Sequence, residues 1–193
     1  MKFPKYVEIE NKRYKINTDF RVAIECNRIA EDETIGDIER VLGIIYTLFG
    51  EEGINTPEHY EKLLEMAKKY LCCGQELEQT NEKPYMDFIE DEGDIRSSFQ
   101  YDYKYDPYEE EYVHWYKYYN DLKNLSNSEF GDCCVLNRII NLRKFDVSKI
   151  KDRKEKEKII KAQKPKVLLT LVLQPTYSST FPNDIVNLII LFY

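Results

Sequence analysis

One stretch near the middle of the chain, residues 85–122, restricts the fold more than any other part of the sequence. It contains the single tryptophan and most of the sixteen tyrosines of this 193-residue protein. Its first half places Ile95, Phe99 and Tyr103 four residues apart, which is the spacing of side chains on one face of a helix. The first half therefore predicts a helix with an aromatic face.

A proline separates this helix from a second one. In the dipeptide Asp106-Pro107, proline disfavours helical backbone angles for the residue before it, so the first helix ends there. The residues that follow have the pattern of an amphipathic helix over 112–122. Its predicted apolar face consists of Tyr112, Trp115, Tyr116, Tyr119 and Leu122. Two aromatic-faced helices joined at a proline predict a core against which other helices pack.

Three uses of the aromatic face are open: stacking of nucleic-acid bases, helix packing, and binding of a protein partner. Base stacking needs a basic groove, whereas the carboxylates within residues 87–111 repel phosphate. We therefore expect no nucleic-acid binding. Helix packing is the ordinary use of such residues, and exposed aromatics also anchor protein interfaces. The candidate protein-binding residues of this face are Tyr112, Trp115, Tyr116 and Tyr119.

The net charge of −7 conceals an asymmetry along the chain. Residues 138–166 contain twelve Lys/Arg and four Asp/Glu, a net charge of +8, whereas residues 1–137 contain sixteen Lys/Arg and thirty Asp/Glu, a net charge of −14. An acidic body thus carries a basic arm. Because the acidic body repels polyanions, we expect the arm to contact protein, including the body of a second copy in a homo-oligomer. The candidate arm residues are Lys151, Lys154 and Lys158.

Most of the remaining chain has helical periodicity. Residues 6–16 alternate apolar and charged side chains on both sides of Asn11-Lys12, which predicts a β-hairpin that turns there. Helical patterns cover residues 17–30 with Asn17 or Thr18 as cap, 35–49 ended by Gly50, 56–74 opened by Thr56-Pro57, 126–143, and 151–164. The predicted fold is mainly α: a single helical domain with a small N-terminal β-hairpin and a charged C-terminal helix.

Three segments are expected to differ in structure. Residues 1–150 form the helical core with its hairpin, residues 151–166 form the basic charged helical arm, and residues 167–193 form an apolar tail that is disordered or strand-like. The apolar runs of the tail, 167–173 and 185–193, are too short to cross a bilayer, so we expect no membrane insertion.

The reactive side chains do not follow the pattern of a known site. Glu111 and His114 have the spacing of half a carboxylate-bridged metal site, but the second half is missing. The vicinal pairs Cys72-Cys73 and Cys133-Cys134 lack the Cys-x-x-Cys spacing of zinc ligands, so reduced thiols are expected and a shared metal site is the weaker alternative. The acidic run 90–94 is typical of a solvated helix start. We expect no catalytic, cofactor-binding or metal-binding residues, no cofactor, and no enzymatic activity.

Several short sequence segments occur in an order and with a spacing that resemble those of a known family. They are the hairpin followed by Ile16–Arg21, Tyr70–Gly74, Asp87-Phe88 with Glu90-Asp91 and Ile95, Tyr112–Lys117, Glu129–Gly131, Arg138, and Ile150–Asp152. Over roughly residues 5–164 the chain resembles the bacteriophage Gp15 family of siphophage-type tail modules. None of these segments is a catalytic motif, so the resemblance rests on their order and spacing. The chain departs from the family after Lys166.

The resemblance implies a non-enzymatic role in phage tail assembly. Proteins of this kind look like tail assembly chaperones that bind the tape measure protein in the host cytoplasm and are absent from the mature virion. The alternative is a structural minor tail or connector protein of the virion. The resemblance also leaves two interpretations of residues 167–193, a frameshift-type extension or an accident of the gene boundary.

Overall fold

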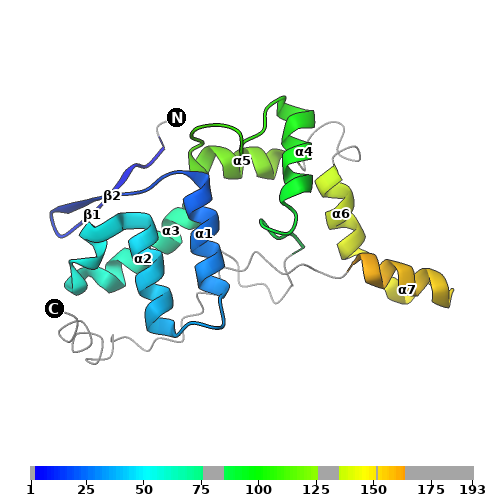
Figure 1. The fold of residues 1–193 in the computed structure, drawn as a ribbon, viewed down its shortest axis with the longest axis horizontal. Coiled ribbons are helices and arrows are strands. Elements are labelled where there is room, and N and C mark those ends of the chain that lie inside the picture. Colours follow the sequence, from blue (N-terminus) through cyan, green and yellow to red (C-terminus); the bar gives the residue numbers. More distant parts are fainter. Residues whose placement is uncertain (1–2, 76–84, 126–134, 151, 164–193) are drawn as a thin grey trace. The chain divides into compact units, whose positions relative to one another are not determined.

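The computed structural model describes residues 3–75, 85–125, 135–150 and 152–163 (Figure 1). Within these residues the chain forms seven α-helices, two 3₁₀ turns and one two-stranded antiparallel sheet. This confirms the predicted fold class, mainly α with an N-terminal hairpin and a charged C-terminal helix. No helix in the described ranges is long and apolar enough to cross a membrane.

The chain divides into two compact units. The described part of unit 1 is residues 3–75 together with 114–116, and the described part of unit 2 is residues 85–113, 117–125, 135–150 and 152–163. Unit 1 is therefore discontinuous in sequence. The domain limits expected at residues 150 and 166 stay predictions, and the tail 167–193 lies outside the described residues.

The hairpin of unit 1 pairs β1 (Tyr6–Ile9) with β2 (Lys12–Lys15), and Ile9 lies opposite Lys12. Its turn is Glu10-Asn11, with φ of 49° and 67°, and not Asn11-Lys12 as the sequence suggested. Two successive positive φ values are typical of the type I′ turn, whose twist matches that of the strands. The hairpin lies beside α2 (Asp37–Ile54) and α3 (Tyr60–Leu71) (Figure 1).

Helix α1 (Phe20–Glu31) begins one or two residues later than predicted. Its cap is Asp19, whose carboxylate accepts the Arg21 N–H at 2.9 Å, in place of Asn17 or Thr18. A carboxylate suits this position because it satisfies a free N–H group and favours the positive end of the helix dipole.

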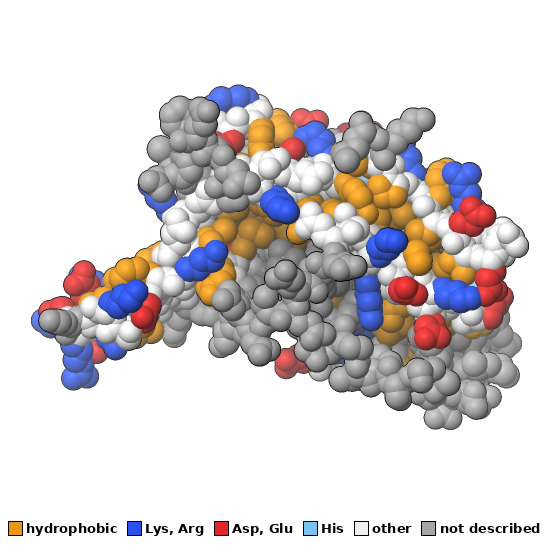
Figure 2. Space-filling model, turned by 180° about the vertical axis from the view of Figure 1, so that it is seen from behind, with side chains coloured by type: hydrophobic (Ala, Val, Ile, Leu, Met, Phe, Trp, Pro, Cys, Tyr) orange, Lys and Arg blue, Asp and Glu red, His pale blue; other side chains and the backbone are white. Residues whose placement is uncertain are grey.

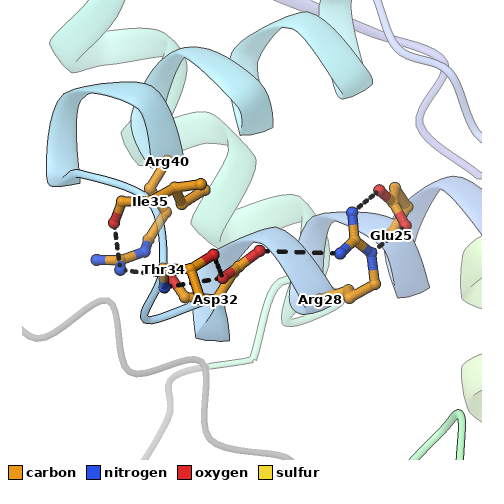
Figure 3. Close-up of polar contacts among 6 residues, drawn as sticks. All are labelled: Glu25, Arg28, Asp32, Thr34, Ile35 and Arg40. Atoms are coloured by element: carbon orange, nitrogen blue, oxygen red, sulfur yellow. Dashed lines mark hydrogen bonds and ion pairs between the residues drawn. The ribbon is translucent and has the colours of Figure 1, made fainter.

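The corner between α1 and α2 is held by side chains that bind backbone carbonyls (Figure 3). Arg40 donates to the carbonyl oxygens of Asp32 at 2.7 Å and Ile35 at 3.2 Å. The Asp32 carboxylate accepts the backbone N–H and the hydroxyl of Thr34, at 2.9 and 2.5 Å. The Arg40 guanidinium thus satisfies two carbonyls of the connection that follows α1, and the Asp32 carboxylate satisfies the backbone N–H of Thr34.

Helix α2 is kinked at Gly50, which has φ 65° and ψ −159°. The sequence placed the end of the helix at this glycine, and helical geometry is indeed interrupted there. Side chains other than glycine are strained in this backbone region. The Leu48 carbonyl accepts the Asn17 N–H at 2.8 Å, which joins the end of the hairpin segment to α2.

The second connection of unit 1 passes through a 3₁₀ turn, η1 (Pro57–His59), into α3. Thr56 occupies the N-cap position and Pro57 is the first residue of the turn, as predicted, but the Thr56 side chain makes no capping hydrogen bond. Its hydroxyl instead donates to the Glu52 carbonyl at 3.0 Å and accepts from the Lys12 ammonium at 2.6 Å. The predicted apolar face of α3 is confirmed, since each of its members is buried. They are Tyr60, Leu63, Leu64, Ala67, Tyr70 and Leu71.

Unit 2 contains α4 (Glu92–Tyr103), most of α5 (Trp115–Leu125), α6 (Val135–Lys144), the 3₁₀ turn η2 (Val147–Lys149) and α7 (Arg153–Ala162). Helix α4 packs against α6, and α7 contacts α6 and η2. Of the predicted inner face of α4, Ile95 and Phe99 are fully buried, and Tyr103 is half-buried. The helix start predicted at Ser126, and Cys133 on its face, lie outside the described residues.

Candidate protein-interaction surfaces

Trp115 is a core residue of unit 1. Its side chain is 1% exposed, and its indole N–H donates to the Leu71 carbonyl at 3.0 Å. Its backbone N–H donates to the Thr18 carbonyl at 2.8 Å, beside an isolated bridge between Asp19 and His114. Leu71 is the last residue of α3, where carbonyls lack helical donors, so the indole caps α3 from outside the helix.

Tyr116 lies half-buried in an aromatic cluster of unit 1. Its ring stacks on Tyr70 with a centroid distance of 5.2 Å, and burial raises the pKa of its hydroxyl to about 12. The ring of His114 packs on Phe3, with a centroid distance of 4.8 Å. His114 Nδ1 accepts the Tyr116 N–H at 3.1 Å, and Nε2 lies 3.1 Å from the Pro4 carbonyl. These contacts fix the neutral tautomer protonated on Nε2, and burial lowers the pKa of the imidazole.

The buried face of α5 differs in part from the predicted one: Trp115 and Leu122 are buried as predicted, whereas Tyr112 is exposed. The helix begins at Trp115 and not at Tyr112, which shifts the inward positions. In unit 2, Tyr118 is 0% exposed and stacks on Phe99 with a centroid distance of 5.3 Å, whereas Tyr119 is half-buried. Sequence reasoning missed Tyr118 because the run Trp115–Tyr119 offers aromatics at nearly every position. Because α5 begins three residues later than predicted, a different aromatic residue of this run, Tyr118, points inward.

A polar contact supports the aromatic cluster of unit 2. The Asp121 carboxylate accepts the Tyr105 hydroxyl at 2.7 Å and the Lys117 ammonium at 2.6 Å. The Tyr103 hydroxyl donates to the Asp121 carbonyl at 2.9 Å. Burial raises the pKa of Tyr105 to about 12, so its proton stays on the hydroxyl at neutral pH. These tyrosines therefore serve the internal structure of unit 2.

A deeply placed ion pair fastens α6 within unit 2. Arg143 donates both terminal nitrogens to the Asp91 carboxylate, at 2.6 and 2.7 Å, and the two side chains are only 7% and 2% exposed. Arg143 also donates to the Tyr85 carbonyl at 2.8 Å. The acidic run that the sequence suggested to be solvated thus contributes Asp91 to the interior. Only a distant arginine makes that burial favourable, and no local pattern reveals it.

The other acidic groups near α4 surround an open polar groove of about 540 Å³. Its lining consists of Glu92, Gly93, Arg96, Ser97, Gln100, Asp106 and Glu109. Arg96 lies within 2.7 Å of Asp106, 3.2 Å of Glu92 and 3.6 Å of Glu109. The carboxylates outnumber the guanidinium, so this groove does not present an anion-binding charge.

Two of the three described thiols and both histidines are buried in structural positions, and Cys73 is half-buried. Cys26 and Cys72 are buried, and burial raises the pKa of both thiols, which disfavours the reactive thiolate. His59 Nδ1 lies 2.7 Å from the Tyr14 hydroxyl. No group of three or more potential metal ligands occurs within the described ranges, and Cys133-Cys134 lies outside them.

The accessible members of the predicted set are Tyr112, Lys154 and Lys158. Tyr112 precedes α5 and is 52% exposed, and the two lysines are exposed on α7. Lys151 lies outside the described residues, while Trp115 is enclosed in the core of unit 1. Further large apolar side chains are at least half exposed, a set that periodicity alone did not single out. They are Tyr46 on α2, Ile89 before α4 and Tyr101 on α4.

Comparison with protein families finds one matching model, described as "Bacteriophage Gp15 protein", over residues 2–168. The match covers well over half of the chain and ends close to Lys166, where the resemblance in the sequence also ended. Neither the curated proteins nor the solved structures gave a match. The family consists of structural, tail-related phage proteins and is not known for enzymatic activity. The chain therefore belongs to the bacteriophage Gp15 family.

Proposed function

We propose that this protein is a tail assembly chaperone that binds the tape measure protein in the host cytoplasm and does not remain in the mature virion. Family membership supports a tail-related role. The observation that carries the chaperone role is the exposure of large apolar side chains on an acidic protein. Tyr46, Ile89, Tyr101 and Tyr112 are each more than half exposed, and the chain carries a net charge of −7.

Both properties suit temporary binding of a long apolar client. Exposed tyrosines provide contact area at little entropic cost and anchor protein interfaces. A net negative charge keeps copies of the protein, and a client coated with them, soluble. A long client offers many sites, so weak contacts by many copies add up to durable coverage. Release during tail assembly is then achieved by losing individually weak contacts.

Co-expression with the tape measure protein of the same phage tests this proposal. We expect the protein to increase the soluble yield of the tape measure protein and to co-purify with it. The double variant Tyr101→Ala/Tyr112→Ala removes two exposed rings and should reduce co-purification several-fold. The control Gln100→Ala/Glu111→Ala alters exposed neighbours of the same rings and should bind like the wild type. If both double variants bind the tape measure protein equally well, Tyr101 and Tyr112 are not part of the interface.

The alternative function is a structural minor tail or connector protein, and virion composition separates the two. Mass spectrometry of purified virions should detect no stoichiometric amount of this protein if it is a chaperone. A fixed number of copies per virion, together with unchanged solubility of the tape measure protein on co-expression, would contradict the chaperone role and favour the structural one.

A further inference from the structure

The charged helix α7 has one face turned inward and one turned to solvent. Lys156, Ile159 and Gln163 are half-buried and recur at the spacing of one helical face. The Gln163 side-chain amide donates to the Leu142 carbonyl at 2.7 Å, which fixes this face toward α6. At 3.6 residues per turn, Lys154 and Lys158 point to the opposite side. Figure 2 shows the Lys and Arg side chains that project from this region.

The two outward lysines carry uncompensated charge. On the neighbouring stripe Arg153 is paired with Glu157 at 3.1 Å, which neutralises both groups. Lys154 and Lys158, by contrast, are exposed and have no ion pair or side-chain hydrogen bond to any described residue. Because they are four residues apart, they form a pair of cations about 6 Å apart along the helix axis.

Unit 1 carries a stripe of the opposite charge at the start of α3. Glu61 and Glu65 are exposed and four residues apart on one face of α3, and Glu58, in the preceding turn η1, is also exposed. None of the three has an ion pair or side-chain hydrogen bond among the described residues. Other carboxylates of unit 1 are paired, for example Glu25 with Arg28 at 2.7 Å and Asp37 with Arg40 at 2.7 Å.

We propose that the Lys154/Lys158 face of α7 docks on the acidic face formed by Glu61 and Glu65 of α3, together with Glu58 of the preceding turn η1, in a second copy of this chain. Glu61 and Glu65 are also four residues apart, so two helices lying side by side bring both cations opposite carboxylates. Each copy carries one basic and one acidic face. The contact is therefore heterologous and repeats from copy to copy, giving open or ring-shaped assemblies.

The contact is weak and sensitive to salt. Exposed ion pairs contribute little individually, and the Debye length falls from about 10 Å at 0.1 M salt to about 3 Å at 1 M. Sedimentation of the full chain should show an average mass that rises with protein concentration at about 0.05 M salt and returns to the monomer above about 0.5 M.

Charge reversal in two variants tests the pairing of these faces. Lys154→Glu/Lys158→Glu gives a chain whose arm is repelled by α3, and Glu61→Lys/Glu65→Lys gives a chain whose α3 repels the arm. Each variant alone should stay monomeric at low salt. An equimolar mixture should associate again, because each variant now carries the partner of the other. The controls Lys5→Glu/Lys15→Glu and Glu8→Lys/Glu33→Lys change the net charge equally, at other exposed positions of unit 1, and should associate like the wild type.

Three results would overturn the proposal. In the first, the mixture remains monomeric while circular dichroism shows both variants folded. In the second, the wild type is monomeric at every concentration, and the variant Lys154→Glu/Lys158→Glu has a larger hydrodynamic radius than the wild type. That result would mean that α7 contacts its own chain and not a second copy. Loss of association in the control variants to the same degree would also refute it, since net charge and not these faces would then control assembly.

Discussion

Replacement of Trp115 by alanine tests the central structural inference about unit 1. The side chain is 1% exposed and its indole N–H supplies a hydrogen bond to the last carbonyl of α3. Truncation of a buried tryptophan lowers the free energy of unfolding by about 3–5 kcal/mol. A unit of this size has a stability on the order of 4–11 kcal/mol. The variant should therefore lose about half of the stability of unit 1.

A second substitution separates the two contributions of this side chain. Trp115→Phe keeps much of the buried apolar area but leaves the Leu71 carbonyl without the indole donor. An unsatisfied buried polar group costs about 1–3 kcal/mol, so the phenylalanine variant should fall between the wild type and Trp115→Ala. Tyr112→Ala, at a position that is 52% exposed, is the matched control and should change stability by less than about 0.5 kcal/mol.

Urea unfolding followed by circular dichroism measures these differences, because the substitutions remove the single tryptophan fluorophore. In the wild type, tryptophan emission reports on unit 1 and should shift to longer wavelength at the urea concentration where unit 1 unfolds. If Trp115→Ala unfolds at the same urea concentration as Tyr112→Ala, the inference that this side chain anchors the core is wrong.

Three further predictions concern single side chains. Gly50→Ala should lower the free energy of unfolding by about 1–3 kcal/mol, measured in urea, because alanine is strained at φ 65°; unchanged stability would mean that α2 is not kinked there. Arg143→Met leaves the Asp91 charge buried and unpaired, and should cost about 3–5 kcal/mol; Arg143→Met combined with Asp91→Asn should recover part of this loss in the same assay. Burial lowers the pKa of His114 from its usual 6.5, so its contribution to stability is complete above about pH 6.5 and declines as the pH falls toward the lowered pKa. The melting temperature of the wild type should consequently drop more between pH 7 and pH 5 than that of His114→Gln, and parallel curves would contradict this assignment.

The local sequence pattern correctly predicted those elements that are determined by residues close to one another in sequence. The apolar face of α3 and the inner face of α4 were correct, because a single helical period determines which residues point inward. The hairpin was also correct, although its turn is displaced by one residue, to Glu10-Asn11. Turn chemistry favours asparagine at either central position, so composition alone did not fix the register.

The parts that sequence reasoning missed depend on contacts between distant residues. Asp91 is buried because Arg143 reaches it from α6, more than fifty residues away. Trp115 belongs to unit 1 because Thr18 and Leu71 receive its N–H groups. The inward turn of Tyr118 follows from where α5 starts, which a continuous aromatic run does not disclose.

The discontinuity of unit 1 has a consequence for synthesis on the ribosome. Its first segment is complete early, but residues 114–116 emerge only after the intervening segment has been translated. At about 5–20 residues per second, this leaves an interval on the order of a few seconds. During that interval the nascent helices lack Trp115, and the Thr18 and Leu71 carbonyls lack its donors. A fragment that ends before Trp115 should consequently be less stable and more open to proteolysis than the same residues within the whole chain.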